Sequence, residues 1–153
     1  MSIIYLDTSA LLKRFIREQG SQALKEIWPS FRVVGSAVVV YAEMAAAFSK
    51  AVRQGWQSAS AAQFAWDMFL EDWPRLTLVG IDTSVVQRAG KLAWEYGLRG
   101  YDAVHLAAAL VWQEGMGEPI TLGTFDRQLW GAAKQSVLTI WPENLEQFTL
   151  PNL

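Results

Sequence analysis

The sequence predicts an α/β protein, a three-layer α/β/α sandwich with a central, mostly parallel sheet. Short apolar runs alternate with stretches of helical periodicity along all 153 residues. Short apolar strands separated by helices are expected for a parallel sheet that helices cover on both faces. No internal repeat and no linker rich in proline or glycine divides the chain. We therefore predict a single domain spanning residues 1–153.

Each predicted strand is a short run rich in β-forming residues, bounded by residues that favour turns or helix caps, such as Asp7 after the first run. A run of this length and composition cannot form a full amphipathic helix, and its neighbours can form one. In chain order the predicted strands are residues 3–6, 32–35, 76–79, 119–122 and 137–140.

The segments between the strands are predicted helices, with start and stop signals at their ends. Pro29 stops one helix and Gly55 ends another, whereas Ser36, Ser58 and Asp82 are placed to cap the helices that follow them. In chain order the predicted helices are residues 10–17, 21–28, about 37–53, about 58–73, about 83–96, 101–114 and 127–134.

Composition excludes several kinds of site. The chain has no cysteine and one histidine, His105, which excludes disulfides, thiolate metal sites and multi-histidine zinc sites. Its net charge is −2, so nucleic acid would have to be attracted by local patches or by bound metal. No apolar run is long enough for a membrane span and no signal peptide is visible, so we expect a cytoplasmic protein without a membrane partner.

Four carboxylates stand in apolar surroundings. Asp7 and Asp126 each follow a predicted strand, Asp102 opens a predicted helix, and Glu43 lies inside an apolar helical run. Carboxylates are rarely buried unless they are paired or bound to a metal ion. Taken singly, each acid could instead cap a helix or pair with an arginine that folding brings near. Their joint placement points to one site, because the carboxyl ends of parallel strands form the usual binding edge.

Convergence of these acids would require a bound cation. Two carboxylates about 4 Å apart repel by about 4 kcal/mol at an effective dielectric constant of about 20. Ligands that are all oxygen atoms favour Mg²⁺ or Mn²⁺ over zinc. Because Mg²⁺ keeps several waters, such a site would present an activated water to a phosphate ester.

Four motifs occur in order: Asp-Thr-Ser-Ala-Leu-Leu-Lys at residues 7–13, Glu43 in a long helix, Gly-Tyr-Asp-Ala-Val-His-Leu-Ala at 100–107, and Thr-Phe-Asp at 124–126. Together they resemble the PIN-domain nucleases, most closely the VapC-like toxins of type II toxin–antitoxin pairs. The resemblance covers nearly the whole chain. It implies a PIN-like fold, Mg²⁺- or Mn²⁺-dependent endoribonuclease activity on RNA, a small antitoxin as partner, and a homodimer.

The resemblance carries the family's catalytic, metal-binding acids onto Asp7, Glu43, Asp102 and Asp126. We expect Asp7 and Asp102 to bind the metal directly and Asp126 directly or through water. Glu43 would hold a water on the metal or a second cation. The last acid is preceded by the hydroxyl of Thr124, as in the family.

Other residues receive supporting roles. Ser9 and Thr124 are placed to hydrogen-bond the carboxylates and fix their rotamers. Arg99 and Arg127 flank two of the acids and are candidate RNA contacts. His105 is expected to be a buried histidine that anchors its helix to backbone.

Other interpretations of the sequence fit its residues less well. A phosphatase of the Asp-x-Asp type needs a second acid where Ser9 stands, and no glycine-rich phosphate loop follows any strand. The strongest alternative is a catalytically inactive PIN-like module that binds RNA or protein. Retention of all four acids argues against that alternative, because a pure binder gains nothing from their repulsion.

Overall fold

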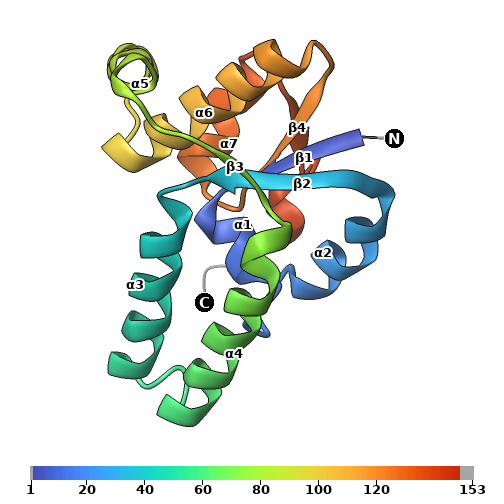
Figure 1. Cartoon of the computed structure of the whole chain (residues 1–153), viewed down its shortest axis with the longest axis vertical. Coiled ribbons are helices and arrows are strands. Elements are labelled where there is room, and N and C mark those ends of the chain that lie inside the picture. The colour runs from blue at the N-terminus through green and yellow to red at the C-terminus, as the bar shows by residue number, and fades with distance from the viewer. Residues whose placement is uncertain (1, 149–153) are drawn as a thin grey trace.

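The aliphatic run Ser2–Leu6 forms β1, the middle strand of a five-stranded sheet in the order β3-β2-β1-β4-β5. The structure is a computed structural model and describes residues 2–148. The remaining strands are β2 (Phe31–Ala37), β3 (Thr77–Val79), β4 (Ile120–Gly123) and β5 (Thr139–Trp141). Every pair of neighbouring strands is parallel. The five predicted strands are confirmed, and the sheet is parallel throughout (Figure 1).

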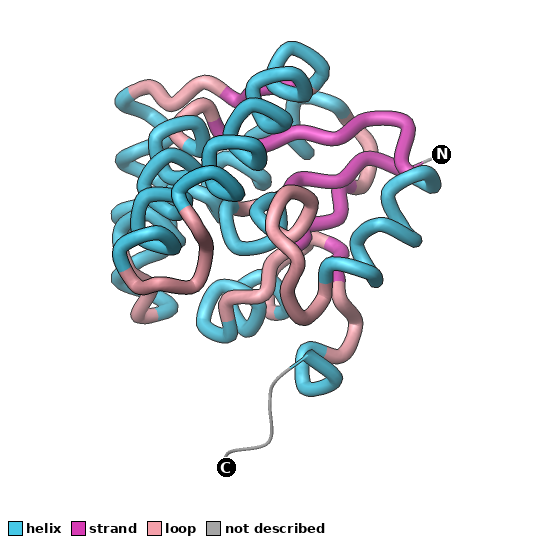
Figure 2. Tube along the Cα trace, turned by 90° about the horizontal axis from the view of Figure 1, so that it is seen from below, coloured by secondary structure: helices cyan, strands magenta, loops and turns pink. Residues whose placement is uncertain are grey.

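Seven α-helices connect the strands within residues 2–148, and a view turned by 90° shows helices around the strands (Figure 2). They are α1 (Thr8–Leu12), α2 (Ser21–Ile27), α3 (Val40–Arg53), α4 (Ala59–Asp72), α5 (Thr83–Tyr96), α6 (Gly100–Met116) and α7 (Arg127–Lys134). None of these helices is long and apolar enough to cross a membrane. The predicted single domain, 1–153, includes residue 1 and residues 149–153, which lie outside the described range.

Two hydrophobic cores, one on each face of the sheet, establish the three layers. Successive strand residues point to opposite faces. Ile3 and Tyr5 therefore pack in a core with α5, α6 and α7, whereas Ile4 and Leu6 pack with α1 to α4. All four are at most 1% exposed, and full burial of such a side chain contributes roughly 1.5–3 kcal/mol. The prediction of an α/β/α sandwich is confirmed.

The first predicted helix ends earlier than expected. It stops at Leu12 as α1, and the chain continues in tight turns in which the N–H groups of Lys13 and Arg14 bond to carbonyls three residues back. The side chain of Lys13 then folds over the next loop, donating to Glu18 and to the carbonyl oxygen of Gln19. The helix expected over 10–17 is therefore wrong beyond Leu12.

The prediction that Ser36 caps the long helix is also wrong. Ser36 is a fully buried residue of β2, and its hydroxyl donates to the Leu6 carbonyl at 2.6 Å. Pairing with β3 extends β2 to Ala37, so α3 begins only at Val40, with no side-chain cap. The predicted caps Ser58 and Asp82 are confirmed, because each accepts from a backbone N–H three residues along the chain.

Candidate active site

The candidate site lies at the carboxyl ends of β1 and β4. These strands are neighbours, with Leu6 paired to Gly123, so the residues after them lie side by side. The Asp7 N–H donates to the Gly123 carbonyl at 3.1 Å and extends this pairing by one residue. The sheet therefore brings Asp7 next to the segment Thr124–Asp126, and this strand-end edge is where open α/β sheets bind ligands.

Asp7 is a buried carboxylate, only 3% exposed. It caps α1: its Oδ1 accepts from the Ala10 N–H at 2.9 Å and from the Ser9 hydroxyl at 2.7 Å, and its Oδ2 accepts from the Thr124 hydroxyl at 2.6 Å. Burial raises the pKa of Asp7, while the hydrogen bonds from Thr124, Ala10 and Ser9 lower it. Within residues 2–148, Asp7 forms no ion pair with lysine or arginine.

Ser9 and Thr124 join the two strand ends through hydroxyl groups. The Ser9 hydroxyl donates to Asp7 and accepts from the Phe125 N–H at 3.0 Å. The Thr124 hydroxyl donates to Asp7 and accepts from the Asp126 N–H at 3.0 Å. Each hydroxyl thus uses both its donor and its acceptor to fix Asp7 against the β4 end.

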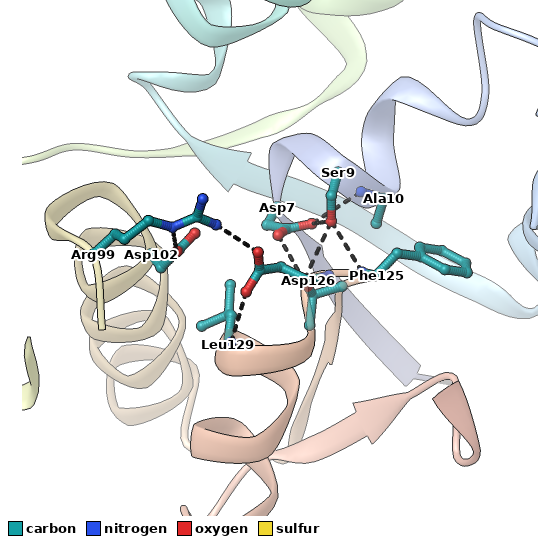
Figure 3. A network of polar contacts seen from close by, with 9 residues as sticks. Asp7, Ser9, Ala10, Arg99, Asp102, Phe125, Asp126 and Leu129 are labelled. Carbon is teal, nitrogen blue, oxygen red and sulfur yellow. Dashed lines mark hydrogen bonds and ion pairs between the residues drawn. The ribbon is translucent and has the colours of Figure 1, made fainter. Parts of the chain in front are cut away.

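Arg99 binds two of the candidate acids at once. Its Nε donates to Asp102 at 2.8 Å, and its second terminal nitrogen donates to Asp126 at 2.6 Å. Figure 3 shows the guanidinium between these carboxyl groups, with Asp7 beyond Asp126. Burial first, and then the negative charge of Asp126, raise the pKa of Asp102, and the Arg99 guanidinium opposes both effects. Asp126 also caps α7 by accepting from Leu129.

Glu43 reaches the site through His105. Its Oε1 lies 2.6 Å from His105 Nε2, and His105 Nδ1 lies 2.7 Å from the Tyr5 hydroxyl. His105 is 2% exposed, so the predicted burial is correct. The prediction that it anchors its helix to backbone is wrong, because its partners are the side chains of Tyr5, Glu43 and, at 3.5 Å, Thr8.

Three of the four acids are thus linked, whereas His105 holds Glu43 separately. The four do not form a metal-binding group as they stand. Thr124 connects Asp7 to Asp126, Arg99 connects Asp126 to Asp102, and His105 holds Glu43. Within residues 2–148, no three acidic or histidine side chains lie together in a way that could hold a metal ion. The donor types suit Mg²⁺ or Mn²⁺, since all four acids offer oxygen. Two of them are occupied by the Arg99 guanidinium, a cation of the protein itself.

A cleft of about 430 Å³ opens beside this network. It is lined by Leu98, Arg99, Asp126 and Arg127, among others. Both arginines that the sequence proposes as RNA contacts therefore border one depression next to a candidate acid.

Sequence reasoning missed two features of the site. One of the two ion pairs of Arg99 could be predicted, because Arg99 and Asp102 are three residues apart at the start of a helix. Its bond to Asp126, 27 residues away, had no local signal. Tyr5 lies within a predicted strand, and nothing in the sequence joins it to His105, 100 residues along the chain.

Comparison with known proteins gives consistent matches. The PIN domain family matches residues 4–133. Ribonuclease VapC45 of Mycobacterium tuberculosis (strain CDC 1551 / Oshkosh) is 32% identical over 150 residues, which cover 95% of this chain and 99% of that protein.

Two solved structures share the fold at lower identity. PAE2754 from Pyrobaculum aerophilum superposes with a TM-score of 0.63 at 19% identity, covering 96% of this chain and 89% of that one. VapBC2 from Rickettsia felis, solved bound to a DNA fragment from its promoter, gives a TM-score of 0.60 at 17% identity, covering 90% and 96%.

Proposed function

This chain belongs to the PIN-domain family, and we propose that it is the ribonuclease toxin of a toxin–antitoxin pair, cleaving RNA internally with Mg²⁺ or Mn²⁺. The observation that carries the proposal is Asp7. A carboxylate that is 3% exposed, with no lysine or arginine partner in residues 2–148, is costly unless a cation neutralises it. The relative named Ribonuclease VapC45, similar over nearly the whole chain, supports RNA as the substrate.

Asp7, Asp102 and Asp126 are the residues that would hold the cation, with Glu43 holding a water or a second cation. A divalent cation there supplies positive charge for the acids and lowers the pKa of a bound water. Asp7 is prepared for this role because Ser9 and Thr124 fix its orientation. Its Oδ2 accepts a single bond within the described chain and so keeps a lone pair.

The arginines at the cleft are proposed to bind the RNA backbone. Arg99 would release Asp102 and Asp126 on cation binding, because its positive charge, bonded to one oxygen of each carboxylate, would repel the cation. Once released, it borders the cleft together with Arg127, where a forked guanidinium pairs well with phosphate. These contacts would position RNA without reading its sequence.

We further propose an antitoxin protein as partner, a homodimer as the assembly and the cytoplasm as the location. The antitoxin is supported by the likeness to VapBC2 of Rickettsia felis, one of a family of toxin–antitoxin complexes. No membrane partner is proposed.

One observation favours the alternative of an inactive RNA- or protein-binding module. Arg99 satisfies two of the four acids, and the described residues contain no ready three-ligand metal group. In that alternative, Arg99 would replace the metal permanently and the acids would be structural.

RNA cleavage with and without a chelator separates the two proposals. Purified protein is incubated with a single-stranded RNA library in Mn²⁺, in Mg²⁺ and in EDTA. The nuclease proposal expects cleavage in either metal, none in EDTA, and none by Asp7→Asn or Asp126→Asn in any condition. Asp67→Asn is the matched control, because Asp67 is an acid on α4 that bonds only Gln63 in the described chain. Metal-independent binding without cleavage would support the inactive module instead.

A further inference from the structure

Three polar side chains form a hydrogen-bonded series that leads from the core on the α5–α7 side of the sheet towards the candidate site. Tyr5 comes from β1, His105 from α6 and Glu43 from α3. Tyr5 is fully buried and His105 is 2% exposed, whereas the Glu43 side chain is 24% exposed. This hydrogen-bonded series therefore starts in the core and ends at a carboxylate that solvent can reach.

The donors and acceptors of these side chains determine where their hydrogens lie. The Tyr5 oxygen accepts from the Ala37 N–H at 3.1 Å, so its own hydrogen can point to His105 Nδ1, 2.7 Å away. The Ser36 hydroxyl, also near Tyr5, gives its hydrogen to the Leu6 carbonyl. In an imidazole with a single hydrogen, the bare nitrogen is a stronger acceptor than the Ser36 hydroxyl oxygen, so a bare Nδ1 receives the Tyr5 hydrogen.

The contact between His105 Nε2 and Glu43 requires the same placement of hydrogens on the ring. A carboxylate can only accept, and Glu43 Oε1 lies 2.6 Å from His105 Nε2. A bare Nε2 would place two acceptors in contact, so Nε2 must carry a hydrogen. With Nδ1 as acceptor and Nε2 as donor, the ring carries its hydrogen on Nε2.

We propose that His105 is a positioning residue: Tyr5 holds it as the neutral Nε2–H tautomer, and this N–H fixes the Glu43 carboxylate at the site. The role of Glu43 towards a cation rests on the proposed function. The assignment of the hydrogens does not.

Neutrality explains why a histidine serves here and an arginine or lysine would not. A cationic partner would cancel the charge that Glu43 must offer to a cation, as Arg99 does for Asp102. A neutral N–H orients the carboxylate and leaves its charge intact. Glu43 needs such a partner, because a long carboxylate side chain at a partly exposed position otherwise samples several rotamers.

The first test is nitrogen NMR of the imidazole in the metal-free wild-type protein at neutral pH. His105 is the one histidine of the sequence, so protein labelled with ¹⁵N-histidine and free of a histidine tag needs no assignment. We expect one bare nitrogen, identified by its ring couplings as Nδ1, and one protonated nitrogen, Nε2. A bare Nε2, or hydrogens on both nitrogens, would overturn the inference. In Tyr5→Phe, which removes the donor to Nδ1, the tautomers should become mixed.

The second test measures metal affinity and turnover in two variants. The side-chain amide of His105→Gln keeps an N–H donor near the position of Nε2, whereas His105→Leu keeps none. Loss of such an orienting contact costs about 10- to 100-fold in metal affinity or activity. For His105→Leu we expect that loss in Mn²⁺ affinity, measured from the change in melting temperature during a Mn²⁺ titration, and in kcat, with KM little changed. His105→Gln should recover at least half of the loss on a logarithmic scale. Equal losses in both folded variants would overturn the inference.

The two proposals fail in different ways. A wild-type protein with the expected tautomer but no RNA cleavage in metal would refute the proposed function and leave the hydrogen assignment standing. An active protein with a bare Nε2 would refute the positioning role alone.

Discussion

Replacing Arg99 with glutamine tests how strongly the protein's own cation competes with metal. Arg99 donates to Asp102 at 2.8 Å and to Asp126 at 2.6 Å, and glutamine removes its charge while keeping an amide. If the proposed cation needs these two acids, it must first displace the guanidinium. The Arg99→Gln variant should therefore bind Mn²⁺ more tightly than wild type and be less stable without it.

The size of the effect follows from the exposure of the ion pairs. The Arg99 side chain is 69% exposed, and exposed pairs contribute about 0.2–1 kcal/mol each, so the two together contribute about 1 kcal/mol. A free energy of about 1 kcal/mol corresponds to a factor of about 5 in an equilibrium constant. We expect about fivefold tighter apparent Mn²⁺ binding. The melting temperature of the metal-free variant should fall by about 2–4 °C, as for proteins of this length.

The assay is a Mn²⁺ titration in which binding is measured from the change in melting temperature. Arg88→Gln is the matched control. Arg88 makes two bonds of 2.8 Å to Glu114, and it lies on α5 with its partner on α6. The control should lose similar stability and keep the wild-type Mn²⁺ affinity. Unchanged or weaker Mn²⁺ binding in Arg99→Gln would refute the competition argument.

Three further predictions concern the same framework. Asp7→Asn should stabilise the metal-free protein at neutral pH, because burial raises the pKa of Asp7. This gain should shrink in urea unfolding as pH falls through the raised pKa, since the folded wild type then takes up a proton before the unfolded chain does; a gain independent of pH would contradict this. Thr124→Val should lower the free energy of unfolding by about 1–3 kcal/mol by leaving Asp7 and the Asp126 N–H short of a partner; unchanged stability in urea would count against it. Gly35→Ala should cost about 1–3 kcal/mol by the same measurement, because its Cβ would lie 2.5 Å from a β3 carbonyl oxygen, whereas the open helical position Gly90→Ala should not destabilise; equal effects would refute the steric argument.

Local sequence was sufficient for most of the fold. The strands were predictable because they are short, largely apolar runs bounded by residues that cap helices. Asp126, for example, follows β4 and caps α7. The errors arose where tertiary pairing overrode local signals. Ser36 has the chemistry of a cap, but pairing with β3 extends β2 through it. Such pairing joins residues distant in sequence, so no local pattern reveals it.

The sequence singled out the candidate acids, whose roles stay predictions, but it did not reveal their contacts. Isolated carboxylates after strands pointed to Asp7 and Asp126, and the structure places them beside each other through Thr124. The sequence could not show that Arg99 spans two acids or that Glu43 meets a buried histidine. Both contacts depend on side-chain directions at the meeting of several elements, which spacing along the chain does not specify.

The most direct test of the metal site is a crystal of the protein grown in Mn²⁺ and measured at a wavelength where manganese scatters anomalously. The account predicts an anomalous peak beside Asp7 Oδ2, shared with Asp102 and Asp126, and an Arg99 side chain turned away from both. Absence of a peak there, with Arg99 still bridging Asp102 and Asp126 at saturating Mn²⁺, would contradict it.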